Sequence, residues 1–214
     1  MRRFRFTILA VCLVLLWLGG NDLALWQRNP APEILSLASL EEQGAPREWL
    51  RVTDTCFNLE RAISMSGDIP PKALLVPLTS VAGGPNDQVW VETREPAYLE
   101  LMVSYHILPN SEWEKEQFRL NNQERFHPCR DVEGMLASPL IATANRNKLL
   151  EVLKGAGITP PADVLLLSEA KEPPTLRGVF FFAIGLLGLL RVFTTWRRPS
   201  DASGNDGLTP PSTP

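Results

Sequence analysis

The chain has 214 residues, a formal net charge of -3 and a sequence pI of about 5.5. This charge balance argues against a nucleic-acid-binding protein, because such domains concentrate lysine and arginine on one face. Two apolar segments near the ends enclose a polar middle of about 150 residues, which is long enough to bury the core of one domain.

The first apolar segment follows a short basic N-terminus. Arg2, Arg3 and Arg5 precede residues 6–20, which carry no charge. This pattern is typical of a secretory signal, but the small residues that cleavage requires are poorly placed after Trp17. The segment is apolar on every face, which argues against a buried amphipathic helix. We predict a cytoplasmic N-terminus over residues 1–5 and a transmembrane helix over 6–26 that is an uncleaved signal anchor, with a cleaved signal as the alternative.

The middle segment, residues 27–177, begins with a predicted short helix and three predicted strands. Residues 29–44 place Ile34, Leu37 and Leu40 on one side of a helix that ends at Gly44. Residues 48–57, 72–80 and 87–94 have the β-branched and aromatic content of strands. The glycines and proline of residues 81–86 predict a hairpin-like turn.

The second half of this segment mixes predicted strands with two predicted helices. We interpret residues 101–107 as a strand, although the pattern also fits a helix. Ser111 and Glu114 form a capping box that begins a helix through residue 126. A further helix within residues 142–157 ends at Gly155, and strands are expected within 129–138 and 162–169. The mixed order predicts an α+β domain, a small curled sheet or partial barrel with flanking helices.

The second apolar segment is predicted to be a transmembrane helix over residues 178–196. Its unbroken apolar run, 178–190, is shorter than the roughly 20 residues that a span requires, which leaves a buried core helix as the alternative. Arg191 can extend its charge to the interface, so that the helix continues to Trp196, an amphipathic residue suited to the headgroup level. The Ser-, Gly- and Pro-rich tail over 197–214 is expected to be disordered and cytoplasmic.

The basic residues around the two segments predict the topology. Arginines precede the first segment and lie at the end of the second, so the positive-inside rule places both termini in the cytoplasm and the middle domain outside. Arg177 is a single dissenting charge at the outer end of the second segment. The arginines on which this prediction rests are Arg2, Arg3, Arg5, Arg191, Arg197 and Arg198.

The cysteines of the middle domain predict a disulfide. Cys12 lies inside the first apolar segment, which leaves Cys56 and Cys129 as a pair in an oxidising compartment. The alternative is two separate reduced thiols. Another alternative is a metal site that combines both cysteines with His106 and His127, although their spacing matches no usual zinc pattern. We interpret His106 as a strand histidine.

Enzyme and cofactor motifs are missing from the sequence. There is no G-x-S-x-G, H-E-x-x-H, P-loop or G-x-G-x-x-G pattern, so we expect no cofactor. The carboxylates Asp54, Glu60, Asp131 and Glu133 are interpreted as solvated surface residues. Gly185 and Gly188 allow close approach of another helix, either the chain's own first span or the span of a partner.

The overall plan resembles a known family. Two end spans around one extracytoplasmic β-rich domain are similar to the surfeit-locus type of haem-copper oxidase assembly factor, and "LALWQR" is similar to that family's tryptophan-glutamine motif after the first span. The resemblance concerns the plan alone, and no residue role is transferred from it.

We therefore interpret the chain as a two-span protein of the bacterial inner membrane that presents its middle domain for protein interaction or assembly, without catalysis. The expected partners are the lipid bilayer and a membrane or envelope protein. The alternative is an extracytoplasmic, membrane-anchored enzyme or metal-handling protein that uses Cys56, His106, His127 and Cys129.

Overall fold

The computed structural model of the chain describes residues 2–64, 70–81, 88–136, 151, 154–155 and 164–196. Two compact units are distinguished, one formed by the chain ends, Met1–Trp26 and Pro174–Pro214, and one formed by Gln27–Pro173. Most of the predicted turn over 81–86 and of the helix predicted within 142–157 lies outside the described residues. The predicted tail over 197–214, with Arg197 and Arg198, lies outside them as well.

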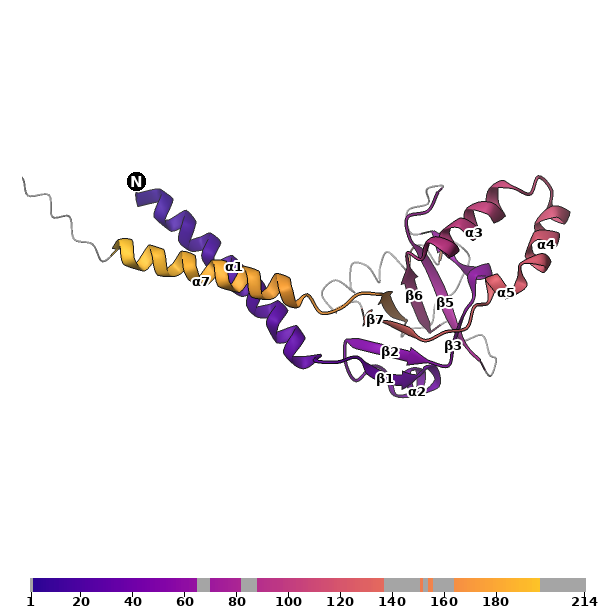
Figure 1. Cartoon of the computed structure of the whole chain (residues 1–214), viewed down its shortest axis with the longest axis horizontal. Helices are drawn as coiled ribbons and strands as arrows, with labels where there is room; N and C mark the ends of the chain where they lie inside the picture. Colours follow the sequence, from indigo (N-terminus) through magenta and orange to yellow (C-terminus); the bar gives the residue numbers. More distant parts are fainter. Residues whose placement is uncertain are drawn as a thin grey trace, which may run out of the picture. The chain divides into compact units, whose positions relative to one another are not determined.

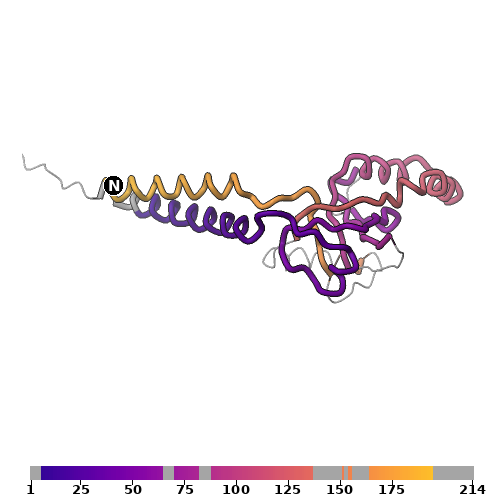
Figure 2. The backbone as a smooth tube through the Cα atoms, turned by 60° about the horizontal axis from the view of Figure 1, so that its bottom comes forward, coloured from indigo at the N-terminus to yellow at the C-terminus, as the bar shows by residue number. Residues whose placement is uncertain are grey.

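Two apolar helices dominate the unit formed by the chain ends. Helices α1 (Arg2–Arg28) and α7 (Thr175–Trp196) lie side by side (Figure 1, Figure 2). Both are long and apolar enough to cross a membrane, over Phe6–Arg28 and Thr175–Thr194. Most of their large apolar side chains are exposed in the isolated chain, as expected of helices whose apolar surroundings lie outside the protein.

Glycines let these two helices approach closely. A Cβ atom at Gly19 of α1 would lie 2.5 Å from the backbone nitrogen of Phe182, and one at Gly185 of α7 would lie 2.8 Å from Cγ of Leu16. A Cβ atom at Gly188 would clash with the buried Sγ of Cys12. Gly185 and Gly188 therefore lie against the chain's own first apolar helix.

An ion pair joins the same two helices. The Nε and Nη2 atoms of Arg177 donate to the two carboxylate oxygens of Asp22, at 2.8 and 2.9 Å. The bidentate geometry is the strongest arrangement of these two groups, and Asp22 is buried. Arg177, which seemed an isolated charge in the sequence, thus has a partner on α1.

The second unit is built on a mixed sheet that curls into a half-barrel (Figure 1). Within the described residues it has eight strands in the order β1-β2-β7-β8-β6-β5-β3, with β4 paired to β5. The pairs β1/β2 and β6/β8 are parallel, and the remaining described pairs are antiparallel. The strands are β1 Glu33–Ser36, β2 Trp49–Thr53, β3 Thr55–Phe57, β4 Ile63–Ser64, β5 Leu74–Ser80, β6 Val89–Thr93, β7 Val132–Leu136 and β8 Leu165–Glu169.

Alternation along the strands decides which side chains enter the core. Leu50 and Val52 of β2 are fully buried in the main apolar cluster, whereas Arg51 between them is exposed. Burying each such side chain contributes about 1.5–3 kcal/mol. The predicted α+β class and the strands within 48–57, 72–80, 87–94, 129–138 and 162–169 are confirmed.

The start of the domain differs from the prediction. Residues 33–36 form β1, and helix α2 begins only at Leu37 and ends at Gln43. Ser36 caps α2 by accepting from the backbone nitrogen of Ser39, so the helix cannot begin earlier. Ile34, expected on the apolar side of the helix, lies in β1 and is exposed. The helix stop at Gly44 is confirmed, with a positive φ of 74°.

Three helices form an excursion between β6 and β7: α3 (Pro96–Ile107), α4 (Glu112–Asn121) and α5 (Gln123–Phe126) (Figure 1). The predicted strand over 101–107 is wrong, because this stretch belongs to α3. Pro96 occupies the first turn, where a missing N–H costs nothing, and Tyr98, Leu101, Met102 and Tyr105 follow at helical spacing and pack on the core. The predicted cap of α4 is confirmed, since the Ser111 side chain accepts from the backbone nitrogen of Glu114.

Candidate functional site

The candidate site is a group of polar side chains around Arg130. A disulfide holds the segment that contains Arg130 in place. Cys56 of β3 and Cys129 are joined by this bond. Backbone hydrogen bonds hold both sides of it: the nitrogen of Phe57 donates to the oxygen of Pro128, and the nitrogen of Arg130 donates to the oxygen of Thr55, each at 3.0 Å. The segment before β7 is thereby held beside β3, and Arg130 follows the bridge directly.

The Arg130 side chain is held from several sides. Its Nε donates to the hydroxyl of Tyr98 at 3.0 Å, and its guanidinium lies 4.9 Å from the centre of the Phe57 ring. An Nη2 atom pairs with the carboxylate of Glu169, which is mostly buried. Partial burial alone would lower the pKa of Arg130, but the hydrogen bond that it donates to Tyr98 and the charge of Glu169 outweigh the burial and raise the pKa. Arg130 is therefore a fixed, permanently charged group.

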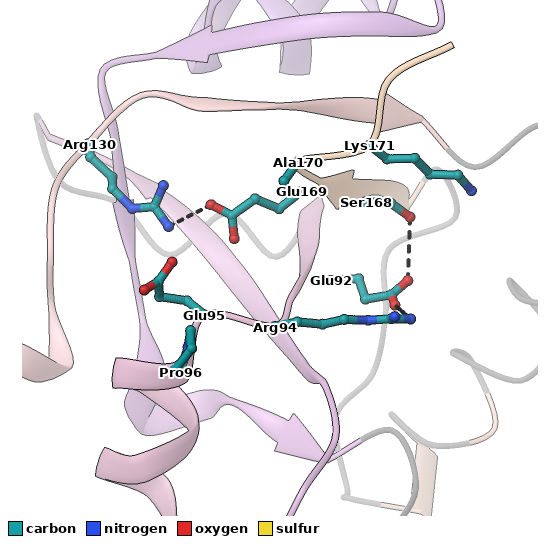
Figure 3. A pocket seen from close by; sticks show the side chains of 9 residues that line it. All are labelled: Glu92, Arg94, Glu95, Pro96, Arg130, Ser168, Glu169, Ala170 and Lys171. Carbon is teal, nitrogen blue, oxygen red and sulfur yellow. Dashed lines mark hydrogen bonds and ion pairs between the residues drawn. The ribbon is translucent and has the colours of Figure 1, made fainter. Parts of the chain in front are cut away.

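Arg130 lines a cleft of about 680 Å³ at the ends of the parallel strands β6 and β8. Arg130 and Glu169 point toward one another at one end, and Ser168 donates to Glu92 farther along (Figure 3). The charged lining consists of Arg94, Arg130 and Lys171 with Glu92, Glu95 and Glu169, three of each sign. The cleft thus has no net charge, and such balanced ion pairs suit the positioning of a polar partner more than the attraction of an ion.

A smaller cavity of about 320 Å³ adjoins this cleft and shares Arg130, Glu169 and Ala170 with it. Its far side is formed by Arg51 of β2 and Glu133 of β7, which are direct cross-strand partners and form an ion pair. Both side chains are partly exposed, so this pair contributes about 0–1 kcal/mol. Glu133, expected as a solvated carboxylate, instead has an arginine partner.

The two histidines lie in different places, whereas the exposed Asp131 lines the same small cavity as Glu133. Nε2 of His127 lies 3.4 Å from a carboxylate oxygen of Glu60, which also accepts from Arg119. His106 lies on α3, next to the Tyr105 ring, so its interpretation as a strand histidine is wrong. Cys56 and Cys129 share a bond and supply no thiolate. In the part of the chain that the structure describes, no group of three or more His, Cys, Asp or Glu side chains is placed to hold a metal ion.

Three exposed apolar side chains lie near the turn from α3 to α4. Ile107 and Leu108, at the end of α3, and Trp113, in the first turn of α4, are 57%, 63% and 71% exposed. Tyr105 of α3, Phe118 of α4 and Phe126 of α5 pack their rings together. These ring contacts join the three helices to one another. We call Ile107, Leu108 and Trp113 the apolar tip.

Comparison with known protein families, with curated proteins and with solved structures finds no match for this chain.

Sequence reasoning did not single out Arg130 or the apolar tip. Arg130 has one local signal, its position directly after Cys129, but Tyr98 and Glu169 reach it only through the order of the strands. The tip is visible as three large apolar residues around the Pro109–Ser111 turn. The strand assigned to 101–107 concealed it, because in a strand these residues would not flank a helix-helix turn.

Proposed function

We propose that the chain is a two-span protein of a bacterial inner membrane that presents the Gln27–Pro173 unit outside the cytoplasm as a non-catalytic binding module for another membrane or envelope protein. Both termini lie in the cytoplasm in this arrangement. The observation that carries the proposal is the apolar tip.

Two features support the membrane placement. Helices α1 and α7 both have the length and hydropathy of a span. Their exposed apolar side chains would be costly in water, and their glycines allow the two helices to pack closely. A pair of closely packed helices with most of its large apolar side chains turned outward suits a bilayer.

Two features support an extracytoplasmic unit. Arg2, Arg3 and Arg5 before α1, and Arg191, Arg197 and Arg198 at the end of the second apolar segment, satisfy the positive-inside rule when both ends are cytoplasmic. The Cys56–Cys129 disulfide belongs to the unit that would then lie outside, where such bonds persist.

The apolar tip supports a protein partner. Exposed tryptophan with neighbouring aliphatic side chains is typical of the residues that dominate binding energy at interfaces. Glu112, Glu114 and Glu116 flank Trp113 on α4. Lys115 pairs with Glu112 and Arg119 pairs with Glu116, so α4 has no excess of basic residues to attract anionic lipid, and a protein surface with an apolar pocket fits the tip better.

The disulfide weakens the metal-handling alternative, because it uses two of the four residues on which that alternative depends. His127 is occupied by Glu60, and His106 lies on a different helix. Binding is therefore the function that the described geometry supports best.

The test is site-specific photo-crosslinking in intact cells. A photoreactive amino acid at position 113 should give a defined adduct with one membrane or envelope protein. The same substitution at Val81, an exposed apolar residue at the end of β5, provides the matched control and should give no such adduct. The double variant Leu108→Ser, Ile107→Ser should weaken the adduct from position 113 at least tenfold without loss of the folded domain. Equal adducts from positions 113 and 81, or none from position 113, would contradict the proposal.

A further inference from the structure

A third cavity, of about 510 Å³, lies where the chain leaves α1. Its charged lining consists of Arg28, Arg47 and Glu48, two positive charges and one negative, and Ala45, Pro46 and Leu136 supply an apolar wall. This combination of paired arginines with aliphatic surface differs from the balanced cleft around Arg130. It suits a ligand that carries an anionic group next to a hydrocarbon portion.

One wall of the cavity is polar and is held together by hydrogen bonds of Asn29. Asn29 is 1% exposed, and its Oδ1 accepts from the backbone nitrogens of Glu48 and Trp49, at 3.1 and 3.3 Å. Its Nδ2 donates to the carboxylate of Glu48 at 2.8 Å. The Glu48 carboxylate is therefore engaged by an amide, and the chain that follows Arg28 is fixed to the start of β2.

Arg47 has a partner that it can exchange. Its Nε lies 3.0 Å from a carboxylate oxygen of Glu33, and both side chains are about a third to a half exposed. A solvated pair of this kind contributes about 0–1 kcal/mol, so an anion held in the cavity can compete with Glu33 for the arginine. A guanidinium is also the group that best matches the geometry of phosphate oxygens.

The position of Arg28 along α1 sets the depth of this cavity in a membrane. Arg28 follows Trp26 by two residues, which is about 3 Å along a helix axis. Trp26 is an exposed, amphipathic residue of the type that collects at the headgroup level. If α1 crosses the bilayer, Arg28 lies beside the lipid phosphates.

We propose that the Arg28–Arg47 cavity binds the phosphate of an anionic membrane lipid, with the apolar wall at Leu136 against the glycerol and first acyl carbons. This site rests on the proposed membrane placement, but it is independent of the apolar tip and its protein partner. It gives the outer end of the first span a specific lipid contact in addition to the unspecific contact of any apolar helix.

The test measures lipid retention by the full-length protein in a neutral detergent, by native mass spectrometry. Phosphatidylglycerol should bind the wild-type chain with one site tighter than the rest, and phosphatidylcholine should not. The Arg28→Gln, Arg47→Gln variant should weaken this site about 30-fold, since each arginine near lipid phosphate contributes about a factor of five. The control Arg94→Gln, Arg125→Gln removes the same charge from arginines that do not line the cavity and should leave the site unchanged.

A charge-conserving variant distinguishes loss of the binding site from loss of the folded structure. Arg28→Lys, Arg47→Lys keeps both charges and should retain the preference for phosphatidylglycerol, with a loss of less than tenfold. Equal weakening in the glutamine variant and its control, or equal retention of both lipids by the wild type, would overturn the site. Displacement of the lipid by millimolar inorganic phosphate would overturn the lipid assignment, because it would identify a site for free phosphate.

A separate experiment tests whether the protein is embedded in the membrane at all. Extraction of the wild-type protein from membranes by alkaline carbonate would refute both the span and the lipid site. A protein that resists extraction but binds lipid without regard to Arg28 and Arg47 would refute only the lipid site.

Discussion

Removal of the Cys56–Cys129 disulfide should destabilise the domain without unfolding it. The bridge joins residues 73 positions apart, and the chain-entropy relation gives about 4.4 kcal/mol for a loop of this length. The native segment keeps the backbone hydrogen bonds of Phe57 and Arg130 on either side of the bridge, so it stays in place when the bond is cut. The expected loss is therefore about 2–4.4 kcal/mol.

The assay is urea unfolding of the full-length protein in mild detergent, with and without reductant, followed by near-ultraviolet circular dichroism. With a slope of about 2 kcal/mol per molar urea, reductant should lower the midpoint by about 1–2 M. The Cys12→Ala variant should keep this sensitivity to reductant, because Cys12 lies in α1 and is free. The Cys56→Ala, Cys129→Ala variant should lose it and should unfold like the reduced wild type.

Two results would refute this reasoning. One is a change below about 0.5 kcal/mol on reduction, since loop closure in the unfolded chain would then contribute nothing. The other is a reductant effect that persists in the Cys56→Ala, Cys129→Ala variant, because the effect would then come from elsewhere.

Three further predictions concern the helices, the connection and the topology. Gly19→Ala should lower the thermal midpoint of the detergent-solubilised protein by an amount equivalent to about 1–3 kcal/mol, because its Cβ would meet Phe182. Gly20→Ala, whose Cβ would meet nothing within 4 Å, should leave the midpoint unchanged, and equal effects would argue against close packing. Asn29→Ala should lower the free energy of unfolding in urea by about 1–3 kcal/mol, because it leaves the partly buried backbone nitrogens of Glu48 and Trp49 without their acceptor. An unchanged free energy of unfolding would mean that water replaces the Asn29 amide. Reporter fusions after Pro199 should be cytoplasmic and those near Gly84 exported, and an exported tail would contradict the proposed orientation.

The sequence predicted the parts of the fold that local chemistry decides. Alternation around Leu50 and Val52 predicted β2, and Ser111 with Glu114 predicted the start of α4 at the correct residue. These signals succeed because each depends on residues that are neighbours in the chain. The length of the apolar segment near each end of the chain likewise predicted two long helices.

The errors arose where tertiary contacts decide between two acceptable local structures. Residues 101–107 contain β-branched and aromatic side chains that suit a strand, but Leu101, Met102 and Tyr105 bury one face of a helix against the core. Ile34 fits the apolar side of a helix, yet residues 33–36 pair with β2 in parallel register. The parallel pairing of β1 depends on a partner strand, β2, that comes later in the chain, so no local pattern in residues 33–36 indicates this pairing.

The candidate site was the least predictable part. Arg130 meets Tyr98 from α3 and Glu169 from β8, and the sheet order that brings them together is not encoded at any of these positions. The cavity near Arg28 depends in the same way on β7, which contributes Leu136. Individual residue types gave no reason to connect these positions.

The pairing of Asp22 with Arg177 has a consequence for biosynthesis. The two residues are 155 positions apart, and translation at about 5–20 residues per second would separate their emergence by roughly 8–30 s. In the proposed membrane arrangement, α1 spends this interval with its glycine-bearing face and the Asp22 carboxylate unmatched. A nascent chain in this state must be sheltered by the insertion machinery or by another helix until α7 arrives. A chain that terminates before residue 177 would never complete the pair, and its Asp22 carboxylate would stay without this arginine.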